Sequence, residues 1–79
     1  MQEGTGRFDL PRSGEIDLAV YNLTGQKVAT LALGLREAGT YALRWDGRDD
    51  DGRDLASGVY LYRLTAGDRA ATRKLLLLR

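Results

Sequence analysis

Hydrophobic and polar residues alternate along most of the chain, and short turns containing glycine interrupt the alternation. A period of two predicts β-strands with one buried face, and closely spaced turns predict antiparallel pairing. The pattern therefore predicts an all-β protein, a small immunoglobulin-like antiparallel β-sandwich of six to seven strands. The strands are expected at 7–10, 15–21, 26–31, 40–45, 59–66 and 70–78.

The connections between these strands are uneven in length. The segment 32–39 has no convincing period and is predicted to be a loop. Val28 and Leu31 differ in parity, so we expect a bulge or an early strand end between them. Segment 46–58 is a long connection rich in turn residues. The side chains expected to face the core are Ile16, Leu18, Val20, Tyr41, Leu43, Trp45, Tyr60, Tyr62 and Leu64.

Composition limits the chemistry available to a chain of this size. The 79 residues are enough for one domain, and they contain no cysteine and no histidine. Disulfides, the usual zinc sites and the familiar nucleophile–base pairs are therefore excluded. We expect no catalytic residues, no cofactor and no metal, and we predict that the isolated domain is not an enzyme.

Charge is balanced overall but uneven along the chain. Twelve basic and eleven acidic residues give a formal net charge of +1, which is no electrostatic footprint for nucleic acid. The segment 46–54 carries five aspartates and two arginines, whereas residues 59–79 are basic. Runs of this kind are usually solvated faces.

The acidic segment has two interpretations. Its five aspartates could offer oxygen ligands to calcium, but their spacing does not fit the calcium-loop pattern. Aspartate and glycine are also the residues that turns favour, because they form local hydrogen bonds and tolerate a positive φ. The turn interpretation is favoured. The aspartates are Asp46, Asp49, Asp50, Asp51 and Asp54.

The last expected strand ends in four consecutive leucines, which cannot all point to one face. Two of them must point away from the core unless that face is also covered. One interpretation is a central strand that its own domain buries on both sides. The other is a sorting or docking strand for a partner, formed by the leucines and the basic residues beside them. Its residues would be Arg73, Lys74, Leu75, Leu76, Leu77, Leu78 and Arg79.

The segment 39–62 contains a motif that spans the acidic connection. It reads Trp-Asp-Gly, a later glycine, then Leu-Ala-Ser-Gly-Val-Tyr-Leu-Tyr. This motif resembles the Ig-like domains of bacterial flagellar hook-capping proteins and the related C-terminal sorting domains of the type IX (Por) secretion system. The resemblance extends over residues 7–79. The positions that match the structural motif are Trp45, Asp46, Gly47, Gly52, Gly58 and Tyr60.

The resemblance implies a non-catalytic module of a larger exported bacterial protein, such as a glycoside hydrolase or peptidase. It would mediate secretion across the outer membrane and cell-surface attachment through Lys74 and the leucines after it. Its partners would be secretion machinery or a cell-envelope component, together with the adjacent domains of the parent protein. The alternative is a structural spacer or scaffold, as in hook-capping proteins. A third candidate is a carbohydrate-binding module, with Tyr21 as the outward-facing aromatic residue.

The first residues suggest a domain cut from a longer protein. Residues 1–6 form a short polar lead or linker before the domain, which is expected at 7–79. They lack the apolar core of a signal peptide, and no segment approaches the roughly 20 apolar residues of a transmembrane span. From the resemblance, we expect the protein at the bacterial cell surface or outside the cell.

Overall fold

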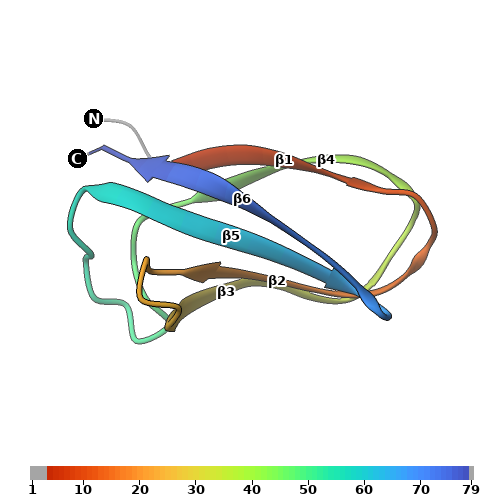
Figure 1. Cartoon of the computed structure of the whole chain (residues 1–79), viewed down its shortest axis with the longest axis horizontal. Coiled ribbons are helices and arrows are strands. Elements are labelled where there is room, and N and C mark those ends of the chain that lie inside the picture. The colour runs from red at the N-terminus through yellow and green to blue at the C-terminus, as the bar shows by residue number, and fades with distance from the viewer. Residues whose placement is uncertain (1–3, 79) are drawn as a thin grey trace.

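The computed structural model describes residues 4–78 as two antiparallel sheets that pack face to face (Figure 1). One sheet has two strands in the order β1-β4, and the other has four strands in the order β3-β2-β5-β6. This architecture confirms the predicted all-β, Ig-like sandwich. The strands are β1 (Gly4–Leu10), β2 (Gly14–Tyr21), β3 (Lys27–Arg36), β4 (Gly39–Trp45), β5 (Gly58–Ala66) and β6 (Arg69–Leu77).

The core lies between the two sheets and contains the side chains that the alternation placed inward. Trp45 is 1% exposed, and Tyr60 and Tyr41 pack at the margin of the buried cluster. Apolar burial is the main stabilising term in a domain without disulfides. The buried residues of the cluster are Phe8, Leu10, Ile16, Leu18, Val20, Ala29, Leu43, Trp45, Tyr62, Leu64, Leu75 and Leu77.

The prediction of a loop at 32–39 is wrong, because β3 continues to Arg36. The expected bulge is present: Leu18 pairs with Ala32 while Ala19 pairs with Thr30, so Leu31 is an extra residue. Beyond this bulge β3 pairs with β2 again, but its hydrophobic residues face solvent and a glycine faces the core. Gly34 lies opposite the core residue Ile16, while Leu33 and Leu35 are exposed. This inversion hid the strand from a reading based on hydrophobic alternation.

The first strand also begins earlier than predicted, at Gly4 rather than Arg7. Residues 4–6 pair with residues 43–45 of β4, so they belong to the sandwich and not to a lead segment. Their composition, Gly-Thr-Gly, carries no hydrophobic alternation. The close packing around Gly6 explains why a small residue is needed here.

Tyr62 of β5 holds β1 through its hydroxyl group. The hydroxyl accepts a hydrogen bond from the Arg7 amide (3.3 Å) and donates one to the Arg7 carbonyl oxygen (2.8 Å). The ring reaches β1 by passing over Gly6, where a Cβ would lie 2.9 Å from the ring carbons and the hydroxyl oxygen. Glycine at this position therefore allows Tyr62 of the four-stranded sheet to bind β1 of the two-stranded sheet.

We predict that Gly6→Ala destabilises the domain by about 1–3 kcal/mol, the usual effect of overpacking. The added methyl group would push the Tyr62 ring away and weaken both hydrogen bonds to Arg7. Gly14→Ala is the matched control, since a Cβ there meets nothing within 4 Å. Urea unfolding of the three proteins measures the effect. Equal stabilities would show that the sheets are not joined through Tyr62.

Candidate functional site: the aspartate loop and the final strand

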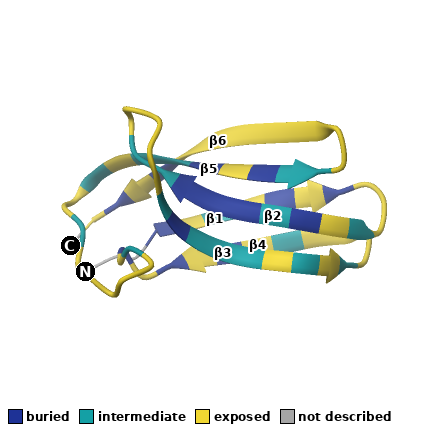
Figure 2. Ribbon diagram, turned by 90° about the horizontal axis from the view of Figure 1, so that it is seen from below, coloured by how far each residue is buried: buried dark blue, intermediate teal, exposed yellow. Residues whose placement is uncertain are grey.

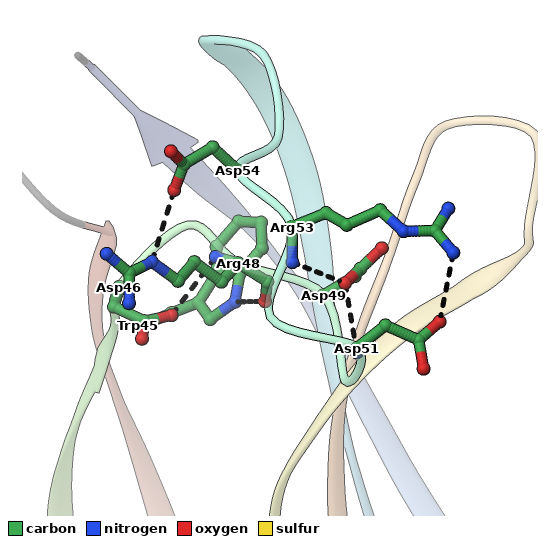
Figure 3. A network of polar contacts seen from close by, with 7 residues as sticks. All are labelled: Trp45, Asp46, Arg48, Asp49, Asp51, Arg53 and Asp54. Carbon is green, nitrogen blue, oxygen red and sulfur yellow. Dashed lines mark hydrogen bonds and ion pairs between the residues drawn. The ribbon is translucent and has the colours of Figure 1, made fainter.

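The connection from β4 to β5 begins with a tight turn beneath the core tryptophan (Figure 3). The Trp45 indole N–H donates to the Arg48 carbonyl oxygen (2.9 Å), and the Asp46 carboxylate accepts the Arg48 amide (3.0 Å). Gly47 has φ +78°, a conformation that other residues rarely adopt. Trp-Asp-Gly is therefore a unit that satisfies the buried indole and reverses the chain.

A second turn follows, and one aspartate organises it. The Asp49 carboxylate accepts the amide hydrogens of Asp51 (3.0 Å) and Arg53 (2.9 Å). Gly52, at φ +84°, donates its amide to the Asp49 carbonyl oxygen (2.9 Å). Arg48 and Asp54 then close the loop through an ion pair of 3.1 Å (Figure 3). Local hydrogen bonding thus explains why aspartate is abundant here.

Asp50 connects this loop to the edge of β3. Its carboxylate accepts the Thr30 amide (2.9 Å), and its own amide donates to the Val28 carbonyl oxygen (3.1 Å). These two hydrogen bonds occupy backbone groups of β3 as a neighbouring strand would. They protect part of the outer edge of β3 from pairing with other chains. The aspartate loop, residues 46–54, therefore shields part of the outer edge of β3.

We predict that Asp50→Ala destabilises the domain by about 0.5–2 kcal/mol, because the Thr30 amide loses its acceptor. Asp51→Ala is the control: its carboxylate forms only an exposed ion pair with Arg53 (3.6 Å), which contributes about 0–1 kcal/mol. Thermal melts of both variants test the difference. Two equal melting temperatures would contradict a specific contact between Asp50 and β3.

The geometry favours the turn interpretation of the acidic segment over a metal site. Within residues 4–78, no group of three or more acidic side chains is placed to hold a metal ion. The carboxylates of Asp46, Asp49 and Asp50 instead accept backbone amides. The remaining motif residues are structural as well. Tyr60 packs edge-on against Trp45 at 4.9 Å and donates its hydroxyl hydrogen to the Ala56 carbonyl oxygen (2.6 Å).

The final strand separates its leucines between two faces. Leu75 and Leu77 are each 1% exposed and lie in the core, while Leu76 is 54% and Leu78 44% exposed. The central-strand interpretation is wrong, because within residues 4–78 the ladder of β6 is formed with β5 and β6 lies at the margin of the four-stranded sheet. Leu75 and Leu77 are therefore unavailable to a partner. The residues predicted for sorting or docking that remain exposed are Arg73, Lys74, Leu76 and Leu78. Arg79 lies outside the described residues.

The first six residues of β6, Arg69–Lys74, are exposed on both faces of the strand (Figure 2). In the described part of the chain, no hydrogen bond or ion pair joins the side chains of Arg69, Arg73 or Lys74 to another residue. By contrast, Arg48 and Arg53 in the aspartate loop are both paired with aspartates. Three cations without a side-chain partner among the described residues thus lie within six residues of the last strand.

Comparison with known families identifies the domain. The family model of the FlgD Ig-like domain matches residues 1–70. The chain belongs to this family. The match covers the Trp-Asp-Gly turn and the Leu-Ala-Ser-Gly-Val-Tyr segment, which carried the resemblance in the sequence. It ends at residue 70, so most of β6 lies beyond it.

Solved structures of FlgD proteins contain the same fold. The chain is similar to FlgD from P. aeruginosa, with a TM-score of 0.75 and 26% identity over 95% of this chain and 58% of that protein. It is also similar to FlgD from Xanthomonas campestris, a structure reported for insights into the hook capping essential for flagellar assembly. There the TM-score is 0.71, with 26% identity over 95% of this chain and 55% of that protein. No protein in the curated set matches.

This chain spans a little over half the length of both FlgD structures. What the whole FlgD protein does therefore does not transfer directly to this domain. The comparisons support the hook-capping part of the resemblance: the family model and both structures described above are of FlgD, and none of these three is a type IX sorting domain. The described residues include no helix with the length and hydrophobicity needed to cross a bilayer.

Proposed function

We propose that this chain is a non-catalytic scaffold domain, which holds neighbouring parts of a larger protein or assembly in place through protein–protein contacts. One observation carries the proposal: the FlgD Ig-like model matches residues 1–70, and the same sandwich is present in two FlgD structures. The polar residues of the domain support it. The carboxylates of Asp46 and Asp49 are engaged in turns, and that of Asp50 binds the edge of β3.

The experiment replaces residues 4–78 by a flexible glycine–serine linker in the full-length protein that carries this chain. Light scattering then measures the mass of the complexes formed by both proteins. A scaffold domain predicts that the linker protein loses a defined assembly while its other domains stay folded. An unchanged assembly, accompanied by the loss of a measurable reaction, would contradict the proposal and favour a catalytic module.

The exposed half of β6 favours a second candidate function, secretion across the outer membrane and cell-surface attachment. Its support is that β6 carries both cations without a side-chain partner among the described residues and exposed leucines, together with the resemblance to type IX sorting domains. In this case the protein would be exported to the bacterial surface. Its partner would be secretion machinery or another envelope component.

Removing the last strand is a poor test of this candidate, because Leu75 and Leu77 would leave the core. A better variant keeps both and changes only the exposed side chains: Arg73→Ser, Lys74→Ser, Leu76→Thr and Leu78→Thr. The chain is fused to an exported fluorescent reporter in a bacterium with a type IX system. Surface signal that these four substitutions abolish would support sorting. Reporter retained in the periplasm with both fusions would contradict it.

A further inference from the structure

β6 differs from the other strands in how little of its first half is buried. From Arg69 to Lys74 no side chain is buried on either face, although the strand is fully extended and pairs with β5 along its length. A strand normally derives its stability from packing on at least one face. The first half of β6 therefore buries no side chain in the core. In residues 4–78, only the edge that faces β5 forms ladder hydrogen bonds.

The other edge of this segment is open. In the described chain β6 has no second strand beside it, and β1 approaches it near Leu75, where Gly4 would place a Cβ 3.2 Å from the leucine side chain. An edge strand directs every second pair of N–H and C=O groups outward, which forms a template for another extended segment. The opposite edge of the sheet differs, because Asp50 covers part of β3.

The charges on β6 indicate what kind of segment would fit. Arg69 and Arg73 pair with Ala66 and Tyr62, so their side chains share the inner side of the sheet, and Lys74 points to the outer side. β6 contains no acidic residue. An added strand with acidic residues at alternate positions would place them beside Arg69 and Arg73, with its apolar residues on the other face.

We propose that residues Arg69–Lys74 of β6 accept an extended acidic segment of a partner protein as an additional strand of the four-stranded sheet. The segment alternates acidic with β-branched apolar residues. This inference rests on the proposed function in one respect, that the domain acts by binding another protein. It adds the place of contact and the chemistry of the partner, in a strand that lies mostly beyond the family match.

The probe is a blocked heptapeptide, Thr-Glu-Val-Glu-Val-Glu-Thr, titrated into the isotopically labelled 79-residue chain. We expect amide resonances of 69–74 to shift and their hydrogen exchange to slow, with a dissociation constant near or below about 1 mM, as for a short strand with few contacts. A peptide with lysine in place of glutamate should not bind. No binding of the glutamate peptide, or shifts confined to other strands, would overturn the proposal.

Charge reversal provides the matched variants. Arg69→Glu with Arg73→Glu should weaken peptide binding by at least about tenfold, because two attractive contacts become repulsive. Arg36→Glu with Arg53→Glu reverses two exposed arginines elsewhere and should change binding less than about twofold, since such distant charges are screened. Equal weakening by both pairs would contradict a local site on β6. The dispersion of the amide spectrum shows whether each variant remains folded.

An anionic membrane is the competing ligand for an exposed basic strand. Vesicles of phosphatidylcholine with phosphatidylserine are therefore tested in parallel with the peptide. Binding to vesicles without peptide binding would overturn the proposal, because lipid headgroups do not use the free backbone edge. The linker-replacement experiment is unaffected by either result, so failure of this inference is distinguishable from failure of the scaffold proposal.

Discussion

Replacing Trp45 by alanine is expected to lower the free energy of unfolding by about 3–5 kcal/mol, the range found when a buried aromatic residue is truncated. Trp45 is 1% exposed, packs against Tyr60 and donates its indole hydrogen to the loop at Arg48. The substitution therefore removes core volume and leaves a backbone carbonyl oxygen without its donor. Few single changes in this domain combine both losses.

The measurement is urea unfolding followed by circular dichroism. A domain of this size has a total stability of about 4–12 kcal/mol, so the variant should lose a large share of it and unfold at a much lower urea concentration. Trp45→Phe is the control, because it keeps most of the apolar volume and loses the hydrogen bond. A loss well below about 1 kcal/mol for the alanine variant would show that the tryptophan is not buried.

Two neighbouring leucines should give opposite results. Leu75→Ala is expected to cost about 2–5 kcal/mol, while Leu76→Ala should stay within about 0.5 kcal/mol. The reason is that Leu75 is 1% exposed and Leu76 54% exposed, on opposite faces of β6.

The two leucine variants serve as controls for each other, since the chemical change is identical. Thermal unfolding of both proteins measures the difference. A result in which Leu76→Ala is the more destabilising variant would mean that β6 is shifted by one residue against β5, which would reverse its inward and outward faces. The proposed docking surface would then lie on the wrong face.

Much of the fold could be predicted from the sequence because most strands follow a regular alternation. Ile16, Leu18 and Val20 mark their face of β2 without help from tertiary structure, and Trp45 does the same in β4. The prediction failed where this rule is broken. In β3 the outward positions carry Leu33 and Leu35 while the inward position is Gly34, so only the pairing with β2 reveals the strand.

Less of the candidate site could be predicted from the sequence. The turn role of the aspartates followed from residue preferences, but the contact of Asp50 with Thr30 joins positions twenty residues apart in the chain. The exposure of Arg69–Lys74 on both faces of β6 is a property of the tertiary structure, which no local sequence pattern records. The basic character of the segment was visible in the sequence, whereas its open edge required the topology.

The scaffold proposal is tested most directly by exchanging the domain within a relative. In FlgD from Xanthomonas campestris, whose structure was reported for hook capping in flagellar assembly, the matching Ig-like segment is replaced by residues 4–78 of this chain, and hooks are counted by electron microscopy. The same exchange with Trp45→Ala controls for folding. We predict that the chimera assembles hooks and that its Trp45→Ala form does not. A chimera that is folded and stable but forms no hooks would contradict the proposal.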